Sequence, residues 1–494
     1  MQDVTIIGAG IAGLSAGVYL QKCGFDVTIY EHHTIPGGAS TSWKRGGYFF
    51  EGGMHWLTGS SPKTSLNKCW REVGALDDAV SVRYRDPFFT YMLPEGEVRL
   101  WRDPEKLCEH LTALSPDDAA EVRRLCKDIK AFQNIQMPVS DVKGLKSEKR
   151  SAPPLGLLLG MLPLLGRMKF YATRSCAEYA SQFKSPLLRA VLENTVGKES
   201  AAIAFIFTVA GLSAGDGGYP EGGSLAMAQR IADTFVGLGG TVAYKSRVEQ
   251  VTVHNGRATG VVVDGAPIAT DAVVVTQDVV TAAASLFTEP LSDTWITDLV
   301  SAKTVTNTFV GLGVEADCSD WDESVFFEPQ SPVMVGGVAE PLLLINNYAG
   351  FAGYAPSGCT ALTCLTGGSA DTYDWWKAAR ENGTYQAEKE KLAKAVMHEI
   401  EAKLPQTKGR FKIWDVATPL TYERYLYSYK GSWMSVMEAG TKQESLPVKP
   451  SGIENVYFAG WRMASPGGLP VALSSGRTAA QTICKDAQRV WRLS

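Results

Sequence analysis

Three glycines stand between a short apolar run and a helix-forming stretch at the start of the chain. The β-branched run at 3–7 predicts a buried strand, and Gly8, Gly10 and Gly13 follow it, just before a helical stretch at 14–22. In this order the first glycine permits a tight turn, the second lets the backbone approach a pyrophosphate, and the third lets helix and strand pack closely. The positive end of the helix dipole then faces the phosphates. The sequence therefore predicts a dinucleotide-binding α/β unit, with a phosphate loop made of Gly8, Gly10, Ile11, Ala12 and Gly13.

A carboxylate follows the second predicted strand. The strand at 25–30 leads directly into Glu31, which comes 18 residues after Gly13. A carboxylate at this spacing accepts hydrogen bonds from a ribose 2′-OH and argues against a 2′-phosphate on the dinucleotide. A glycine-rich turn in an unrelated α/β fold is the alternative, but it does not require strand, glycines, helix, strand and acid in this order.

Two glycine-rich stretches after Glu31 favour FAD over NAD. The stretch 35–41 contains a Gly-Gly pair, and the stretch 45–55 combines glycines with aromatic residues. Both resemble the flavin superfamily that includes amine oxidases, phytoene desaturases and Rab GDP-dissociation inhibitors. In that superfamily the Gly-Gly pair passes beside the pyrophosphate, and the following hairpin reaches toward the isoalloxazine ring. The resemblance thus implies cofactor contacts at Gly37, Gly38, Ser40 and Thr41.

The C-terminal region extends the resemblance. A strand-like run at 455–459 is followed by a Pro-Gly-Gly-Leu-Pro turn at 466–470 and a small-residue helix from about 471 to 485. A helix N-terminus at this place can direct its dipole at the flavin ring and stabilise negative charge there. Trp461 stands where many relatives have an Asp that binds the ribityl chain, which leaves that contact to the backbone or to Arg462. The cofactor residues implied here are Gly460, Trp461, Arg462, Gly468, Leu469 and Pro470.

The middle of the chain supplies the rest of the cofactor domain. Residues 247–263 read as a hairpin and 272–276 as a buried strand. The resemblance implies that this segment completes the cofactor domain and that the backbone of Val248 binds adenine. We expect an α/β fold: a Rossmann-type FAD-binding domain assembled from 1–60, 220–285 and 450–485, plus an α+β substrate domain from 60–220 and 285–450.

Two further motifs resemble the branch of phytoene desaturases, carotenoid cis-trans isomerases and retinol saturases. They are the Tyr-Pro-Glu-Gly-Gly turn from residue 219 and the stretch 417–433, and Ala39 replaces an Arg that is usual in amine oxidases. The resemblance implies an FAD-dependent oxidoreductase acting on a carbon–carbon double bond of an apolar, lipid-like polyene, by saturation, desaturation or cis-trans isomerisation. The alternatives are a flavin amine or amino-acid oxidase, and a non-catalytic prenyl- or lipid-binding protein of the Rab GDP-dissociation inhibitor type.

Four side chains close to these motifs are candidates for proton transfer near the flavin: Glu51, His55, Tyr422 and Glu423. Flavin chemistry on an apolar polyene needs only hydride transfer plus a proton donor or acceptor. Each candidate also has a structural interpretation. Glu51 can tie down a hairpin, His55 can be a hydrogen-bonded buried imidazole, Tyr422 can pack, and Glu423 can pair with a neighbouring cation.

Three tyrosines follow these candidates at alternate positions. Tyr425, Tyr427 and Tyr429 have strand spacing, which predicts that their phenols share one face. That face could be the wall of a substrate tunnel or an ordinary packed sheet surface.

No second strand followed by G-x-G-x-x-G occurs in the sequence. We therefore expect no nicotinamide domain, and the external electron donor or acceptor stays unknown.

Composition and charge exclude several partners. The chain has 48 Lys and Arg against 52 Asp and Glu, a net charge of -4, so nucleic acid is not an expected partner. Its nine cysteines form no C-x-x-C pair and its six histidines have no ligand spacing, so we expect no metal. The N-terminus lacks the pattern of a signal peptide, which favours the cytoplasm.

The most apolar stretch runs from Leu155 to Gly166. Its 12 residues are too short to cross a bilayer, which takes about 20. It could dip into a membrane surface, with Arg167 and Lys169 meeting the head groups, or it could cover the substrate cavity. Location in the cytoplasm, with possible contact at the membrane surface, is the expectation.

Overall fold

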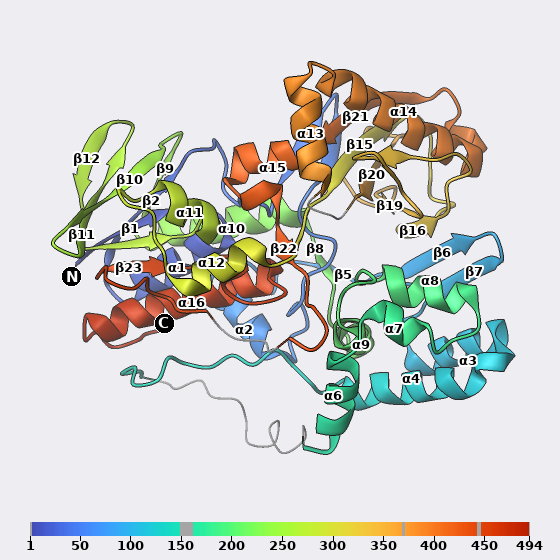
Figure 1. Ribbon diagram of the computed structural model, residues 1–494, viewed down its shortest axis with the longest axis horizontal. Coiled ribbons are helices and arrows are strands. Elements are labelled where there is room, and N and C mark those ends of the chain that lie inside the picture. The colour runs from blue at the N-terminus through green and yellow to red at the C-terminus, as the bar shows by residue number, and fades with distance from the viewer. Residues whose placement is uncertain (1, 149–161, 368–370, 442–445, 494) are drawn as a thin grey trace.

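Two sheets, one in each half of an elongated molecule, organise the structure (Figure 1). The structure is a computed structural model that describes residues 2–148, 162–367, 371–441 and 446–493. The chain passes back and forth between the halves, so that each sheet is built from segments far apart in the sequence. None of the helices in these ranges is long and apolar enough to cross a bilayer.

The first sheet is parallel throughout, with the strand order β23-β13-β1-β2-β9. Its strands are rich in valine and isoleucine whose side chains are buried, as expected for a parallel sheet covered on both faces. The strands are β1 (Asp3–Ile7), β2 (Asp26–Glu31), β9 (Thr241–Tyr244), β13 (Ala272–Val275) and β23 (Val456–Phe458). Each strand that the sequence predicted for this region is confirmed.

Three helices pack on this sheet, and small residues allow their close approach. They are α1 (Ile11–Lys22), α10 (Gly223–Gly237) and α16 (Gly468–Asp486). A Cβ on Gly476 of α16 would lie 2.3 Å from the carbonyl oxygen of Ala12 in α1, so the two helices cross at a residue without a side chain. The predicted hairpin is present as β10 (Val248–His254) and β11 (Arg257–Val263), and β12 (Ala266–Ala269) extends it.

The second sheet has the order β21-β15-β20-β19-β16-β6-β7 and is antiparallel except for the β16–β6 pair. Helices α13 (Asp371–Glu381) and α14 (Tyr385–Lys403) cover one face of it. The strands are β6 (Phe89–Leu93), β7 (Gly96–Leu100), β15 (Thr308–Val314), β16 (Ser324–Phe327), β19 (Leu343–Asn347), β20 (Thr360–Thr366) and β21 (Phe411–Ala417).

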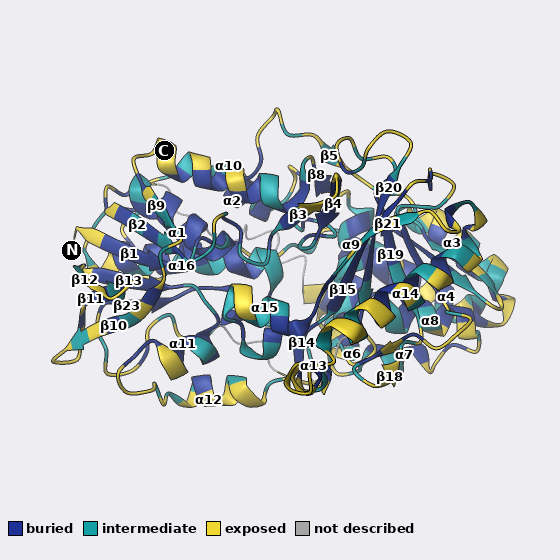
Figure 2. Cartoon of the chain, turned by 90° about the horizontal axis from the view of Figure 1, so that it is seen from above, coloured by how far each residue is buried: buried dark blue, intermediate teal, exposed yellow. Residues whose placement is uncertain are grey.

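A group of helices lies beside β6 and β7 (Figure 1) and encloses a separate apolar core, and Figure 2 shows the buried residues of these helices in dark blue. The central helix is α9 (Ala202–Ser213), which has no charged residue and is largely buried. The others are α3 (Pro104–Leu114), α4 (Ala119–Phe132), α6 (Leu165–Ala172), α7 (Cys176–Ala180) and α8 (Pro186–Asn194).

A short hairpin joins the two halves. Its strands are β3 (Ser42–Arg45) and β4 (Tyr48–Glu51), and the rings of Tyr48 and Phe50 pack on β15. A Cβ on Gly311 would lie 2.7 Å from the Phe50 ring, and one on Gly313 would lie 2.6 Å from the Tyr48 ring. Glycine in β15 therefore makes room for the hairpin.

The remaining elements connect these units. They are α2 (Ser65–Glu72), α11 (Val279–Ser285), α12 (Thr294–Ser301), α15 (Pro419–Leu426), β5 (Val82–Arg83), β8 (Tyr219–Pro220), β14 (Thr304–Val305), β17 (Met334–Val335), β18 (Val338–Ala339) and β22 (Met434–Ser435).

One predicted element is wrong and another falls mostly outside the described residues. Tyr425, Tyr427 and Tyr429 do not lie on a strand: Pro419 begins α15, Tyr427 ends it in a left-handed conformation (φ 50°), and Tyr429 starts a 3-10 turn. Of the apolar stretch from Leu155 to Gly166, residues 155–161 are not described. The rest forms a 3-10 turn and the start of α6.

Candidate functional site

A cavity of about 2370 Å³ lies between the two sheets and opens to solvent. Pockets for single small molecules usually measure roughly 300–1,000 Å³, so this cavity has room for a dinucleotide and a second molecule. Most of the predicted cofactor residues line it: Gly8, Gly10, Ile11, Ala12, Glu31, Gly37, Gly38, Ser40, Thr41, Val248, Gly460, Trp461, Gly468, Leu469 and Pro470. Gly13 and Arg462 do not line it.

The phosphate loop has the backbone that its glycines predict. Gly8 has a φ of +100°, and the backbone N–H of Gly37 donates to the Ala9 carbonyl at 2.8 Å, which holds the second glycine stretch against the first. A Cβ on Gly13 would lie 2.0 Å from the carbonyl oxygen of Gly8, so this glycine serves the packing of α1 on β1. Helix α1 begins without a side-chain cap and without an acidic residue in its first turn, which leaves its N-terminal N–H groups for an anion.

Glu31 is a buried carboxylate held by three donors. Its Oε2 accepts from the backbone N–H of Ala9 at 2.7 Å, and its Oε1 accepts from the N–H of His33 at 2.8 Å and faces Nδ1 of His32 at 3.1 Å. Burial opposes ionisation, but the bonds from His32, His33 and Ala9 outweigh it, and the pKa of Glu31 is lowered. The group therefore stays a carboxylate that can accept a further hydrogen bond from a sugar hydroxyl.

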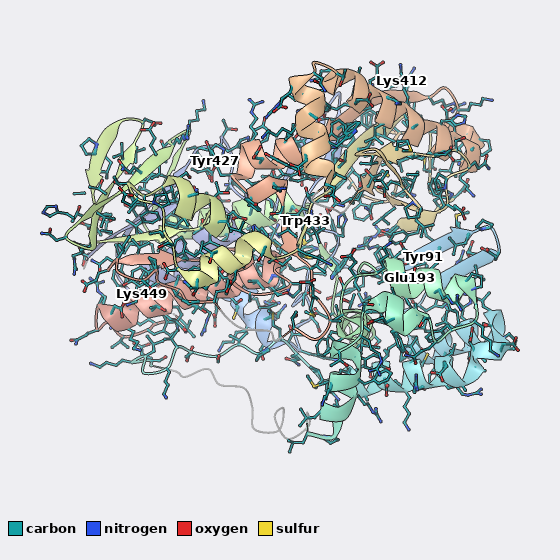
Figure 3. The ribbon with its side chains drawn as sticks, in the orientation of Figure 1. Tyr91, Glu193, Lys412, Tyr427, Trp433 and Lys449 are labelled. Atoms are coloured by element: carbon teal, nitrogen blue, oxygen red, sulfur yellow. The ribbon has the colours of Figure 1, made fainter. Side chains whose placement is uncertain are left out.

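Aromatic side chains from α15 cover the Glu31 end of the cavity. The ring of Tyr427 lies 4.9 Å from the imidazole of His32 and 5.5 Å from the guanidinium of Arg247, and Tyr425 lies 5.2 Å from His33. All of these residues line the cavity. Figure 3 shows Tyr427 in the region between the two sheets. The sequence did not predict this role, because it assigned these tyrosines to a strand.

The start of α16 forms the opposite end of the dinucleotide groove, which is the part of the cavity between Glu31 and α16. Gly467 and Gly468 have positive φ values of 99° and 76°, and the helix begins without a side-chain cap. A Cβ on Gly467 would lie 2.8 Å from the carbonyl oxygen of Trp461, so this turn packs directly on Trp461. The helix begins about three residues earlier than the sequence predicted, which brings its N-terminal N–H groups to the cavity.

Arg462 is turned away from the cavity. Its guanidinium donates to the carboxylate of Asp278 at 2.9 Å and to the carbonyl of Leu299 at 2.7 Å, and it is almost completely buried. Asp278 in turn caps α11 by accepting from the N–H of Val280 at 2.9 Å. The side chain of Arg462 thus stabilises the cavity wall from the side that faces away from the cavity.

The four candidates for proton transfer occupy different places. His55 and Tyr422 line the cavity, whereas Glu51 and Glu423 do not. Burial raises the pKa of Tyr422. Glu423 accepts a hydrogen bond from the phenol of Tyr373 at 2.6 Å.

Glu51 joins the β3–β4 hairpin to α10. It is fully buried, and Oε2 accepts from the Tyr219 phenol at 2.6 Å, the backbone N–H of Ser224 at 2.9 Å and the Ser42 hydroxyl at 3.2 Å. Its Oε1 accepts from the N–H groups of Gly53, at 2.9 Å, and Met54, at 3.2 Å. Because Ser224 is in the first turn of α10, the helix dipole also favours this negative charge.

Apolar side chains line the part of the cavity next to α9 and the second sheet. Phe89, Phe207, Phe326, Leu342 and Leu344 face this space. The carboxyl of Glu340 also lines the cavity, and burial raises its pKa. Nothing in the sequence singled out Glu340, because it belongs to no motif.

Within the described ranges, no three His, Cys, Asp or Glu side chains converge as metal ligands would.

The residues around the groove fit a flavin dinucleotide. The uncapped starts of α1 and α16 lie on the same cavity, with the Gly37-Gly38 turn and the Glu31 carboxylate between and beside them. They provide hydrogen-bond donors for phosphates and a ring edge, and an acceptor for a ribose.

Comparisons with known proteins agree with this geometry. Residues 11–484 match the family of flavin-containing amine oxidoreductases. The chain is 24% identical to a chloroplastic prolycopene isomerase of Arabidopsis thaliana, covering 98% of this chain and 83% of that protein. It is 23% identical to a lycopene-forming phytoene desaturase of a Paracoccus species, covering 97% of each.

Solved structures share the fold over nearly the whole chain. A putrescine oxidase variant superposes with a TM-score of 0.62 at 17% identity, covering 98% of this chain and 99% of that one. An oxidoreductase from Methanosarcina mazei superposes with a TM-score of 0.58 at 17% identity, covering 96% and 99%. The chain has the α/β fold of these enzymes, as predicted. It belongs to the family of flavin-containing amine oxidoreductases and is an FAD-dependent oxidoreductase.

Proposed function

We propose that this enzyme acts on a carbon–carbon double bond of an apolar, lipid-like polyene, by saturation, desaturation or cis-trans isomerisation. The observation that carries the proposal is the size and lining of the cavity, which extends past the dinucleotide groove into a space walled by Phe89, Phe207 and Phe326. The relatives named as prolycopene isomerase and phytoene desaturase support this substrate class.

The proposed cofactor site divides into two ends. We assign the pyrophosphate to the first turn of α1 and the Gly37-Gly38 turn, the ribose to Glu31, and the adenine to the backbone of Val248. We assign the flavin ring to the start of α16, between Gly468 and Pro470. When bound, FAD supplies hydride acceptance and donation at its ring.

The domain assignment follows the same division. We assign segments 1–60, 220–285 and 450–485 to cofactor binding, and segments 60–220 and 285–450 to substrate binding. The membership of the two sheets supports this, since the parallel sheet and its helices come from the first set and the antiparallel sheet comes from the second.

Among the candidate catalytic residues, we assign His55 and Tyr422 to the substrate side of the cavity. Both line the cavity, and the buried phenol of Tyr422 keeps its proton at neutral pH. We assign Glu51 to holding the β3–β4 hairpin and the segment after it, which contains His55, because Glu51 lies outside the cavity and five donors occupy its carboxylate.

A cavity-filling variant tests the substrate assignment. Gly211 of α9 lines the cavity, and a Cβ there would have open space around it. We expect Gly211→Phe to lose most polyene binding and to keep its FAD content, because the new ring occupies only the apolar part. Gly237→Phe is the matched control, since Gly237 of α10 also has open space but lies outside the cavity lining. Equal polyene binding by both variants would contradict the assignment.

We also propose that an apolar substrate is taken up from a membrane surface near α6. Leu162, in the 3-10 turn before α6, and Leu165, at the start of α6, are more than half exposed, at 59% and 52%, and Lys169 lies on α6. Met168 of α6 lines the cavity, so this helix contributes both to the exposed apolar surface and to the cavity wall.

Sedimentation with anionic lipid vesicles tests this contact. Leu162→Glu combined with Leu165→Glu should lower the bound fraction severalfold, because two apolar contacts become negative charges. Val236→Glu is the control, since Val236 of α10 is 54% exposed but lies on the other half of the molecule. Unchanged binding of the double variant would rule out this surface.

A further inference from the structure

A chain of polar side chains leads from the second sheet to His55 at the cavity wall. Ser324 of β16 and Asn346 of β19 are directly paired across the two strands, and the Ser324 hydroxyl donates to Oδ1 of Asn346 at 2.7 Å. The Nδ2 of Asn346 faces Nδ1 of His55 at 3.5 Å. Arg85, in the connection between β5 and β6, donates to the Ser324 hydroxyl and to the backbone carbonyl of His55. Four separate segments thus meet beside His55.

The position of this chain ties it to the cavity. The next cross-strand pair on the same face of these strands is Phe326 with Leu344, and both residues line the cavity. His55 lines the cavity too. The polar pair therefore continues an apolar wall toward the imidazole, and it does not belong to the core on the opposite face of the sheet.

Each hydrogen bond among these side chains has a definite donor and acceptor. A guanidinium can only donate, so the Ser324 oxygen accepts from Arg85, and the Ser324 hydroxyl donates to Oδ1 of Asn346. This orientation presents the NH2 group of Asn346 to His55, and Nδ1 must then be an acceptor without a proton. A neutral imidazole in this environment carries its proton on Nε2.

The electrostatic surroundings also keep the ring neutral. Burial, followed by the positive charge of Arg85, lowers the pKa of His55 to about 4. The other charged or titratable groups close to Arg85 are Tyr348, Glu323, Tyr219 and Arg83. Glu323 is paired with Arg83, and in the part of the chain that the structure describes no carboxylate forms an ion pair with Arg85.

We propose that Asn346, Ser324 and Arg85 are positioning residues that hold His55 as a neutral imidazole with its proton on Nε2. Among the described residues no hydrogen bond reaches Nε2, and His55 lines the cavity, so this N–H is available to a polar atom of the flavin or to the π electrons of the polyene. His55 then serves as an uncharged hydrogen-bond donor and not as a general acid. The inference deepens the proposed function, and it depends on that function only for the identity of the bound molecule.

The tautomer of His55 is directly measurable. In the purified holoenzyme labelled with ¹⁵N-histidine, a ¹H–¹⁵N spectrum distinguishes a ring protonated at Nε2 from one protonated at Nδ1. The chain has six histidines, and the spectrum of His55→Gln assigns the signal. We expect the Nε2–H form, with no titration between pH 5 and 8. A signal from Nδ1–H, or titration near pH 6.5, would overturn the proposal.

Asn346→Asp tests whether the NH2 group of Asn346 is the hydrogen-bond donor to Nδ1 of His55. A carboxylate can only accept, so Nδ1 of His55 must take a proton, and the affinity of the ring for a second proton should rise roughly ten- to a thousandfold. His55 should then titrate within the range of pH 5 to 8. Asn347→Asp is the matched control, because the neighbouring side chain points to the other face, where it donates to Cys318 and Trp321. That variant should leave the His55 signal unchanged.

Ser324→Ala and Ser324→Thr test the hydrogen bond by which Ser324 orients the Asn346 amide. Loss of the hydroxyl frees Asn346 to turn its amide over, so the alanine variant should show a mixture of both tautomers, and threonine should restore the Nε2–H form. In turnover assays the alanine variant should lower kcat more than it raises KM. An unchanged His55 tautomer in Ser324→Ala would overturn the claim that Ser324 orients Asn346. A changed tautomer with unchanged kcat would overturn its role in the reaction.

Failure of the proposed function gives a different result. If no polyene is converted, the NMR measurements still report the tautomer of His55, since they require no substrate.

Discussion

At the scale of single residues, the cofactor groove depends on positions where a side chain would collide with the backbone. Gly13 is such a position, since a Cβ would meet the Gly8 carbonyl oxygen at 2.0 Å. The sequence motif predicted this position because the close approach of helix and strand is a property of the backbone itself.

Gly13→Ala should lower the free energy of unfolding by about 1–3 kcal/mol or more, because backbone atoms must shift to admit the methyl group. Urea unfolding of the purified protein measures the change, and FAD content should fall with it. Gly237→Ala is the control: its Cβ meets nothing within 4 Å, and it should change stability by less than about 1 kcal/mol in either direction. If Gly13→Ala is as stable as the control, the close packing of α1 on β1 is not needed.

The lowered pKa of Glu31 predicts that stability and FAD retention depend on pH. Its pKa is lowered in the folded protein, so its contribution to stability is complete above the unfolded value of about 4.3 and is lost as the pH falls through the folded value. FAD retention and stability of the wild type should therefore decline below about pH 4.

Glu31→Gln removes the charged acceptor of the Ala9 and His33 N–H groups. It should weaken FAD binding by roughly 1.5–3 kcal/mol at pH 7, because bonds to a charged acceptor are replaced by bonds to a neutral one. Titration of the apoprotein with FAD at pH 7 and pH 4 measures this. A variant that retains FAD as the wild type does at both pH values would contradict the assigned role of the carboxylate.

At the scale of secondary-structure elements, α15 shows where sequence patterns mislead. The alternation of Tyr425, Tyr427 and Tyr429 predicted a strand, but Pro419 and the cap formed by Thr418 and Thr421 begin a helix just before them. The local start signal prevails over a short period-2 pattern, and Tyr425 and Tyr427 consequently reach the cavity from the end of a helix.

Tyr427→Ala should release FAD about two- to tenfold faster, because the ring that covers His32 and Arg247 is lost. Stopped-flow measurement of FAD release into excess scavenger apoprotein gives the rate. Tyr427→Phe keeps the ring and should behave as the wild type does. Equal release from the alanine variant would show that α15 does not restrain the cofactor.

At the scale of the whole molecule, the sequence predicts the parallel sheet better than the antiparallel one. The strands of the parallel sheet carry glycine motifs and β-branched runs, whose backbone requirements are local. The cavity wall of the second sheet is different. Arg85, His55, Ser324 and Asn346 come from four distant segments, and only the pairing of β16 with β19 brings two of them together. No local sequence pattern predicts that these four residues lie together.

The same difference between local patterns and long-range topology decides which residues of the candidate site could be predicted. The groove residues were predicted because each belongs to a motif, whereas Glu340 and Tyr427 lie on the cavity through long-range topology alone. Glu51 was predicted as a candidate from its place in a motif, and the structure shows its carboxylate occupied by the hairpin and α10. A motif therefore locates a residue near a site without determining which way its side chain points.

The central claim is that this FAD-dependent oxidoreductase acts on the double bonds of an apolar polyene. The most direct test mixes the purified holoenzyme, without oxygen, with a long conjugated polyene in vesicles, in separate samples with oxidised and with reduced flavin. The account predicts a new polyene in at least one sample, by absorption spectrum and mass, and no reduction of the flavin by aliphatic amines. Amines that reduce the flavin, together with a polyene recovered unchanged from every sample, would contradict it.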